Sequence, residues 1–138
     1  MKAEWSKDWN SSIKPRKQRK FRYNAPLHIK QKFVTVHLSP ELRKKYTMRS
    51  TNLRKGDKII IIRGQHRKKK GNVDRVMLRR GKVFVEGIES VKKEGTTTQI
   101  ALEPTNLMIT ELNLDDKKRR AKLEKNIIDW FLIGKYDI

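Results

Sequence analysis

Five short segments between residues 51 and 112 constrain the fold of this chain most strongly. All are rich in Ile, Val and Thr, and turn signals that contain glycine separate most of them. In the third segment, Val83 and Val85 alternate with Phe84, which suits a strand with two different faces. Five strands in about sixty residues predict a small closed barrel, because closure leaves no exposed edge strand. The segments are KGDKIIIIRG, GNVDRVML, KVFVEGI, TTQIAL and NLMITEL.

The chain is strongly cationic, and its charge is concentrated towards the N-terminal end. It has 35 Lys and Arg residues against 15 acidic ones, a net charge of +20 in 138 residues. Residues 1–50 carry 14 basic and 3 acidic side chains (+11), residues 51–110 carry 14 and 6 (+8), and residues 111–138 carry 7 and 6 (+1). Self-repulsion at this charge opposes folding, so a polyanionic partner is expected, and nucleic acid is the leading candidate.

The sequence contains no pattern typical of an enzyme or a metal site. The chain has no cysteine, which excludes disulfides and thiolate metal ligands. The three histidines, His28, His37 and His66, have no ligand spacing, and no phosphate loop ending in Gly-Lys-Ser/Thr occurs. Asp57 and Asp74 fit a turn and a strand better than acid–base chemistry. We therefore expect neither catalysis nor a cofactor.

The sequence also lacks the pattern of a membrane span or an export signal. The longest apolar-rich run, Ile127 to Ile133, is interrupted by Asp129 and is too short to cross a bilayer. The segment MKAEWSKDWNSS lacks the apolar core of a secretory signal. We expect a cytoplasmic protein without a membrane partner. The alternative is a C-terminal helix that lies on a membrane surface.

Residues 1–50 are predicted to form a basic N-terminal arm with one short helix. The stretch Ile13 to Pro26 is basic, holds two prolines and shows no sustained period, so we expect it to be extended until it meets a partner. Phe21 and Tyr23 interleave with its cations, and they could either stack on unpaired RNA bases or anchor the arm on the barrel. The short helix is expected over SPELRKKY, where Ser39 can cap the first turn.

The rest of the chain divides into the barrel, residues 51–112, and a C-terminal helix with its tail, residues 113–138. Asp115 is the expected cap of this helix, and Gly134 is expected to end it. The residues that share its apolar face at helical spacing are Leu123, Ile127 and Phe131. The role of the tail stays open.

The densest local positive charge lies in the loop after the first barrel strand. Four apolar residues, Ile59 to Ile62, lead into Arg63, Gly64 and a basic run that ends at Gly71. The two glycines allow sharp turns or the close approach of another backbone. Cations that project from a rigid loop lose little conformational entropy when they dock on phosphates. The residues themselves therefore predict docking on phosphates; the alternative is a solvated loop that only adds solubility.

The order of these features resembles the KOW family and, more closely, large-subunit ribosomal protein family twenty-four in its archaeal–eukaryotic form. The KOW pattern begins at Lys55 and includes the apolar strand, the basic loop and the second strand. Transcription elongation factors share that pattern, whereas the further blocks follow the order of the ribosomal family over roughly residues 14–125. The blocks are KPRKQRK, NAPLHIK, SPELRKKY, RSTNLRKGDKI, VEGIESVKKEGTT and DDKKRRAKLEK.

The resemblance implies a mostly β fold, with a five-stranded SH3-like barrel, a basic N-terminal extension and a C-terminal helix. It implies a structural constituent of the large ribosomal subunit that binds large-subunit (23S-type) ribosomal RNA in its 5′ domain, with the basic loop entering a groove of that RNA. Such a protein helps to initiate subunit assembly and lies near the exit of the nascent-peptide tunnel. The expected partners are this RNA and neighbouring ribosomal proteins, and no homo-oligomer is expected. A transcription elongation module that binds RNA polymerase is the competing function, although such a module would be less cationic.

The residues expected to contact RNA are mostly basic and lie in the arm, the short helix, the barrel entry and the turns. They are Lys14, Arg16, Lys17, Arg19, Lys20, Arg22, Tyr23, Lys30, Lys32, Arg43, Lys44, Lys45, Arg49, Arg54, Lys55, Arg63, His66, Arg67, Lys68, Lys69, Lys70, Arg79, Arg80, Lys92 and Lys93. The glycines expected at structural turns are Gly56, Gly64, Gly71 and Gly81.

The chain departs from the family pattern in two places. Where many members have a further glycine in the basic loop, this chain has Lys68. We therefore expect this loop to be stiffer than those of its relatives, and its binding to depend more on contacts with phosphate. The segments MKAEWSKDWNSS and NIIDWFLIGKYDI match no block of the family.

Overall fold

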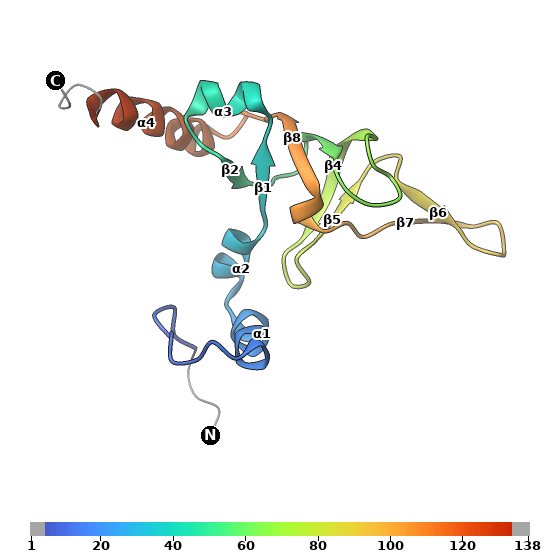
Figure 1. Cartoon of the computed structure of the whole chain (residues 1–138). Coiled ribbons are helices and arrows are strands. Elements are labelled where there is room, and N and C mark those ends of the chain that lie inside the picture. The colour runs from blue at the N-terminus through green and yellow to red at the C-terminus, as the bar shows by residue number, and fades with distance from the viewer. Residues whose placement is uncertain (1–4, 134–138) are drawn as a thin grey trace.

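The computed structural model describes residues 5–133, which form one mixed β-sheet with helices at both ends (Figure 1). The strand order is β2-β1-β8-β3-β4-β5, antiparallel except where β1 pairs with β8. The strands are β1 (Thr35–Leu38), β2 (Ser50–Asn52), β3 (Lys58–Ile61), β4 (Lys70–Met77), β5 (Lys82–Val85) and β8 (Leu107–Glu111). A separate hairpin consists of β6 (Glu89–Val91) and β7 (Thr97–Gln99), and the 3-10 helix η1 (Pro104–Asn106) precedes β8.

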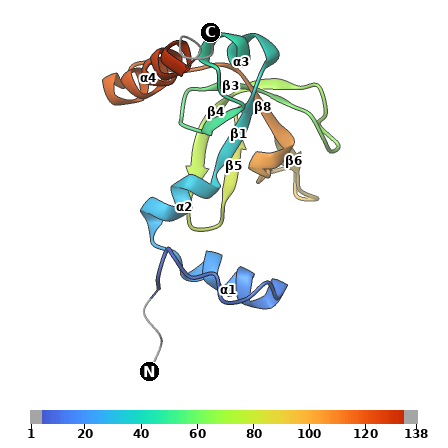
Figure 2. The same cartoon turned by 60° about the vertical axis from the view of Figure 1, so that its left-hand side comes forward.

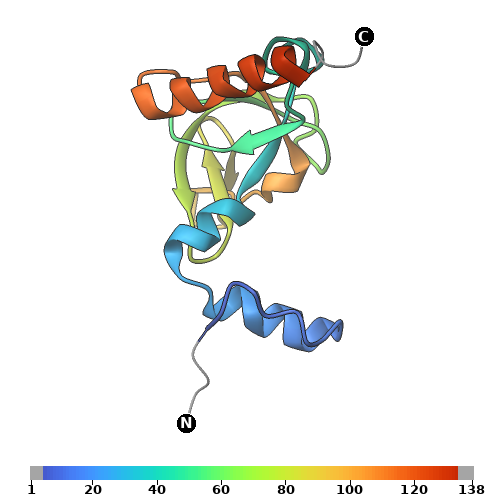
Figure 3. The ribbon, with the colours of Figure 1, turned by 90° about the vertical axis from the view of Figure 1, so that its left-hand side faces the viewer.

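The sheet is strongly curved but does not close into a barrel. Its edge strands are β2 and β5, and no ladder joins them within residues 5–133 (Figure 3). The expected sheet with helices at both ends is confirmed, whereas closure of the sheet into a barrel is not, and the helices take up more of the chain than the mostly β prediction implies. One physical reason is that the TTQIAL segment forms β7, which pairs with β6 instead of the main sheet. That segment returns to the sheet only through a bridge between Leu102 and Val83.

Strands β1 and β2 bring part of the expected basic arm into the sheet. Val36 and Leu38 are buried, and Thr35 between Val34 and Val36 is exposed. In the antiparallel pair, His37 lies opposite Ser50. Val34, Val36 and Leu38 alternate with Thr35 and His37 as in a strand, but the sequence prediction assigns this segment to the arm and so misses the strand.

Inward-facing residues of the strands form one hydrophobic core. In β3, Ile59 and Ile61 are buried while Ile60 is partly exposed, as the alternation of a strand requires. Burial of apolar surface contributes roughly 25 cal/mol per Å², the main stabilising term of such a core. The core residues are Val34, Val36, Leu38, Leu53, Ile59, Ile61, Val73, Val83, Val85, Ile88, Leu107 and Ile109.

The N-terminal cationic stretch is helical, so the expectation of an extended arm over Ile13 to Pro26 is wrong. The helices there are α1 (Pro15–Asn24) and α2 (Leu27–Phe33). Pro15 fits the first turn, and the Arg, Lys and Gln residues that follow are good helix formers. The rings of Trp5 and Trp9 stack on Phe21, with centroid distances of 5.0 and 5.5 Å. Because α1 has no buried residue, this stacking replaces contact with the core.

The two helices that the sequence predicts are confirmed, with one change of cap. In α3 (Pro40–Tyr46), the Ser39 hydroxyl accepts a hydrogen bond from the Leu42 N–H at 3.4 Å, as predicted. α4 (Lys117–Ile133) lies across one end of the curved sheet (Figure 3). Asp115 is not its cap, because the helix begins at Lys117 and the residue directly before it is Asp116. Asp116 takes that role and accepts from the Lys118 N–H at 2.9 Å.

The apolar face of α4 is seen only in part. Leu123 is buried as expected, and Ile127 is partly buried. The side chain of Phe131 and all of Gly134 lie outside the described residues. No helix in the described part of the chain is long and apolar enough to span a membrane.

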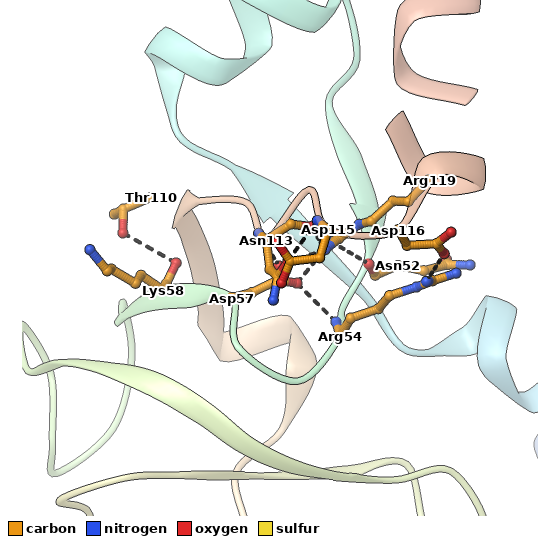
Figure 4. A network of polar contacts seen from close by, with 9 residues as sticks. All are labelled: Asn52, Arg54, Asp57, Lys58, Thr110, Asn113, Asp115, Asp116 and Arg119. Atoms are coloured by element: carbon orange, nitrogen blue, oxygen red, sulfur yellow. Dashed lines mark hydrogen bonds and ion pairs between the residues drawn. The ribbon is translucent and has the colours of Figure 1, made fainter. Parts of the chain in front are cut away.

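A buried ion pair fixes α4 to the sheet (Figure 4). Arg119 donates through Nη1 to Asp57 Oδ1 at 2.6 Å and through Nη2 to Asp57 Oδ2 at 2.8 Å. The same carboxylate accepts the backbone N–H groups of Arg54 and Asn113, both at 2.9 Å. Arg119 also donates to the carbonyls of Asn52 and Asn113. The end of β2, the start of β3 and the first turns of α4 therefore meet at one satisfied pair.

Replacement of Arg119 should reveal how far the fold depends on this pair. Arg119→Met leaves the Asp57 charge buried without its partner, which is expected to lower the free energy of unfolding by about 3–5 kcal/mol. Urea unfolding followed by circular dichroism measures the change. The matched control is Lys122→Met, an exposed cation of the same helix, which should change stability by no more than about 0.5 kcal/mol. Equal effects of the two variants would contradict the assignment.

Candidate nucleic-acid interface

The basic loop between β3 and β4 stands on a hydrogen-bonded base. The Lys68 N–H donates to the Ile61 carbonyl at 2.8 Å, and the Ile61 N–H donates to the Lys69 carbonyl at 2.9 Å. On the other side, the Ile62 N–H donates to the Asn106 carbonyl at 2.8 Å, which ties the loop to η1. Short turns within the loop are closed by Arg67 and Lys69, whose N–H groups donate to residues three positions earlier. The backbone that carries the cations is therefore restrained before any ligand binds.

The two glycines of the loop have different roles. Gly64 has a φ of +103°, so it makes the turn that leaves β3. Gly71 lies within β4 and has no such backbone requirement. A Cβ atom at Gly71 would lie 2.6 Å from Val85 Cγ1 and 2.9 Å from the Glu86 carbonyl oxygen. Gly71 therefore permits the close approach of β5, the second of the two roles that the sequence allows.

Lys68 adopts the left-handed conformation, with a φ of +71°. In the part of the chain that the structure describes, Thr47 is the only other residue besides glycines with a positive φ. A left-handed residue with a Cβ costs roughly 1–2 kcal/mol. Glycine would adopt this conformation without that cost, which gives a physical reason for the glycine expected at this point of the loop. Here the chain accepts local strain and presents a further cation.

The cations of the loop are exposed and face no carboxylate. His66 alone in this set is partly buried, and no ion pair involving the loop occurs within residues 5–133. The exposed cations are Arg63, Arg67, Lys68, Lys69 and Lys70. Unpaired charge on a restrained backbone is suited to binding phosphate, because little order has to be imposed on association.

A second cationic surface surrounds a groove of about 320 Å³ between the N-terminal helices and the β4–β5 turn. The predicted RNA-binding residues that line it are Arg22, Tyr23, Lys30, Arg79 and Arg80. Figure 2 shows the β4–β5 turn directed towards α1 and α2. Gly81 belongs to the same turn. Five residues from three parts of the sequence thus meet at one place, which no sequence pattern indicates.

The remaining cations of α1 and α2 are exposed, and two of them border a different cavity. Lys17 and Lys20 lie at a cavity of about 240 Å³ beside Trp5, Trp9 and Phe21. The other exposed cations of this region are Lys14, Arg16, Arg19 and Lys32. The helix places them on a regular scaffold in place of the flexible arm that the sequence suggests.

The predicted residues of α3 lie at the end of the molecule opposite α1 (Figure 1). Arg43 has an internal role, because its Nε donates to the Leu38 carbonyl at 2.8 Å. Lys45 lies over the Tyr46 ring, with Nζ 5.3 Å from the centroid. Lys44 and Arg49 are exposed. The predicted contacts therefore do not form one continuous patch.

Two predicted residues at the entry to β3 already have acidic partners. Arg54 forms an ion pair with Asp116, and Lys55 Nζ lies 3.8 Å from Asp74 Oδ1. The Lys118 backbone N–H and the Arg54 guanidinium hold the pKa of Asp116 below its ordinary value. Gly56 makes the turn between these residues and β3. The internal partners restrict Arg54 and Lys55 as ligands for RNA.

Lys92 and Lys93 are found in the turn of the β6–β7 hairpin, which projects away from the main sheet (Figure 1). Both side chains are exposed. β6 and β7 pair with each other in a sheet of their own, and neither lysine lines the groove.

Comparison with known proteins decides the family. A sequence profile for the eukaryotic ribosomal proteins L26 and their archaeal counterparts, the ribosomal proteins L24, matches residues 12–126. The chain belongs to this family. It is therefore a ribosomal protein of the archaeal–eukaryotic type and not an enzyme, in agreement with the sequence resemblance.

Relatives cover most of the chain and nearly all of their own length. Large ribosomal subunit protein uL24 of Methanospirillum hungatei is 45% identical over 112 residues, which is 81% of this chain and 93% of the relative. The protein of the same name from Methanothrix thermoacetophila is 45% identical over 108 residues, 78% of this chain and 93% of the relative. That from Methanosarcina barkeri is 43% identical over 114 residues, 83% and 98%.

Sequence reasoning misses two parts of the framework that positions these cations. Nothing marks Arg119 among the six cations of residues 111–133 as the one that is buried. Trp5 and Trp9 stand out only as large aromatics in a polar segment, a weak signal that they stack on something. Both features concern how the interface is supported, and neither is a contact to a ligand.

Replacing Lys68 by glycine tests whether this position carries strain. Lys68→Gly should raise the free energy of unfolding by about 0.5–1 kcal/mol, because relief of the left-handed strain exceeds the entropy that glycine adds to the unfolded chain. The matched control is Lys69→Gly, which removes the same charge at a residue without positive φ and should lower stability by about 0.5–1 kcal/mol. Urea titrations of both variants measure the two changes. Shifts of the same sign would contradict the explanation.

Proposed function

We propose that the chain is a structural constituent of the large ribosomal subunit that binds ribosomal RNA. The observation that carries the proposal is the basic loop, whose exposed cations lack acidic partners within residues 5–133 while the backbone beneath them is hydrogen-bonded to β3 and η1. The names of the relatives, which place those proteins in the large subunit, support it. The site is thus built for a large polyanion and not for a small substrate.

The more detailed parts of the proposal follow from the family. We infer that the RNA is the 5′ domain of large-subunit (23S-type) ribosomal RNA, that binding helps to initiate assembly, and that the protein lies near the tunnel exit beside other ribosomal proteins. The protein would act in the cytoplasm, on the ribosome, and would not form a homo-oligomer. The curved β3-β4-β5 meander is consistent with a variant of the SH3-like barrel, with residues 51–112 as its main part. All the predicted contacts named above remain candidates for this RNA.

The charge of the protein favours this function over a polymerase-binding KOW module. A net charge of +20 in 138 residues suits a long phosphate backbone, since each neutralised phosphate releases counterions. A module that binds a protein surface gains little from so much charge of one sign and suffers its self-repulsion. Native lysate fractionated on a sucrose gradient separates the two functions. Migration with the large subunit, lost only at high salt, is expected of the ribosomal protein.

Neutralising the loop tests its contribution to RNA binding. The variant Arg67→Gln, Lys68→Gln, Lys69→Gln, Lys70→Gln should weaken binding to a large-subunit RNA fragment. It should also reduce the slope of log K against log salt by about 3, because about four phosphates lose their contacts. Wild-type protein is expected to show a slope of roughly −7 to −9 if it neutralises around ten phosphates. Filter binding over a range of salt concentrations measures both slopes.

A second variant distinguishes the loop from net charge alone. Replacing Lys117, Lys118, Lys122 and Lys125 by Gln removes the same charge from exposed positions of α4. This control should leave the slope closer to that of the wild type than the loop variant does, and both proteins should keep the thermal melt of the wild type. If the slope of log K against log salt falls by the same amount in both variants, the loop has no special part in binding.

A further inference from the structure

The groove between the N-terminal helices and the β4–β5 turn contains a largely exposed aromatic ring, Tyr23. Tyr23 is 79% exposed, although it lies only two residues from Phe21, which Trp5 and Trp9 cover. The sequence allows the two aromatics to stack on RNA bases or to serve as anchors. The structure separates them, because Phe21 holds the N-terminal segment in place while Tyr23 is left at the groove.

Cations lie beside the aromatic rings of this groove. Lys30 Nζ lies 5.5 Å from the centroid of the Tyr23 ring, and Arg22 Cζ lies 5.6 Å from that of Phe33, which is 40% exposed. Because most of the Tyr23 side chain is open to solvent, Lys30 leaves much of the ring available. An aromatic platform with flanking cations is the combination that proteins use to hold single-stranded nucleic acid.

The opposite wall of the groove supplies positive charge. Arg79 and Arg80 of the β4–β5 turn are exposed, and neither forms an ion pair within the described residues. Glu103 also lines the groove, but its carboxylate is paired with Lys82. The groove therefore has unneutralised cations on both walls, and its one lining carboxylate is already compensated.

We propose that this groove binds an unpaired nucleotide of the RNA, with its base stacked on Tyr23 and its phosphates held by Arg79 and Arg80. The inference rests on the proposed function, since it assumes that the partner is RNA, and it adds the kind of RNA element that this surface takes. A base inside a duplex cannot offer its face to a side chain, whereas a loop or bulge can. Stacking on tyrosine is sequence-tolerant, so the site selects single-stranded character and not a particular base.

The groove and the basic loop share one structural element, η1. Pro104 and Thr105 line the groove, and the next residue, Asn106, accepts the hydrogen bond from Ile62 at the base of the loop. The two cationic surfaces therefore border the same short helix. One RNA segment could contact the loop through its phosphates and place an unpaired nucleotide in the groove.

The test compares a short single-stranded RNA that carries one 2-aminopurine with a duplex of the same sequence, using the full-length protein. Stacking on Tyr23 should quench the 2-aminopurine fluorescence of the single strand. Tyr23→Ala should abolish that quenching and weaken single-strand binding about tenfold, because one stacked base is lost. Duplex binding should be unchanged. The salt slope should also be unchanged, because no charge is removed.

Matched variants guard against indirect effects. Tyr23→Phe keeps the ring and should behave as the wild type, and so should Ile13→Ala, which removes an apolar side chain that is 95% exposed outside the groove. The double change Arg79→Gln, Arg80→Gln should reduce the single-strand salt slope by about 1.4, because roughly two phosphate contacts are lost. Retention of quenching and of affinity by Tyr23→Ala would overturn the inference.

The same measurements separate this inference from the proposed function. If the wild type binds a large-subunit RNA fragment with a steep salt dependence while Tyr23→Ala behaves as the wild type on the single strand, only the nucleotide site is overturned. If the wild type binds neither RNA with a steep salt dependence, RNA binding itself is overturned, and the nucleotide site with it.

Discussion

The ion pair between Asp57 and Arg119 is the interaction on which the arrangement of the molecule depends. It joins residues that are 62 positions apart in the sequence, and it fixes the start of β3 against the first turns of α4. Removing both charges from water is costly, and the attraction offsets that cost only where the geometry is good and every remaining donor and acceptor is satisfied. Here the carboxylate accepts from Arg119 and from two backbone N–H groups. The pair therefore selects one register between helix and sheet, because any other register leaves a buried charge without its partner.

That register matters for the interface because β3 leads directly from Asp57 to the basic loop. The strand is short, with Ile59 and Ile61 in the core, so a shift of its start would reverse which side chains face inward. The loop is then tied to the same strand by the Ile61 backbone and to η1 by Ile62. A buried pair at one end of β3 thus determines where the cations at its other end are presented.

Several of the acidic residues are paired with cations outside the loop and the groove, and so are not available to neutralise these two surfaces. Among residues 5–133, four exposed or partly exposed ion pairs involve Asp74, Glu103, Glu111 and Asp116, and the buried one involves Asp57. Exposed pairs contribute little to stability, about 0–1 kcal/mol each. Their consequence is spatial: the loop and the groove keep their positive charge, and the free protein bears the repulsion that an RNA partner would relieve.

The parts of the fold that the sequence predicts are those with a local pattern. β3, β4, β5 and β8 combine short runs rich in Ile, Val and Leu with turn residues, and α3 has a capping serine and a proline in its first turn. β2 and β6 are only three residues long and hold at most one apolar residue each, so they carry no alternation, and they exist because partner strands are present. α1 has no apolar face to recognise, since its tertiary contact is the stacking of two tryptophans on Phe21.

The site shows the same division between local and tertiary information. The cations and the glycines of the loop can be predicted from the sequence, because the charge of a side chain and the backbone freedom of glycine are properties of single residues. The groove cannot, because it brings Tyr23 of α1 next to the β4–β5 turn, more than fifty positions away in the chain. The buried state of Arg119 likewise depends on the position of Asp57, and no property of the helix sequence alone distinguishes it from Arg120.

Lys68 connects the loop's conformation with its proposed partner. Its left-handed backbone means that glycine would be the more stable residue in the free protein, whereas the lysine adds a cation among Arg67, Lys69 and Lys70. The advantage of a charge at this position lies in the bound state, where a further phosphate contact can offset the strain. The free protein is thus slightly less stable than it would be with glycine at position 68. We interpret this loss of stability as a consequence of a loop that is suited to binding a polyanion.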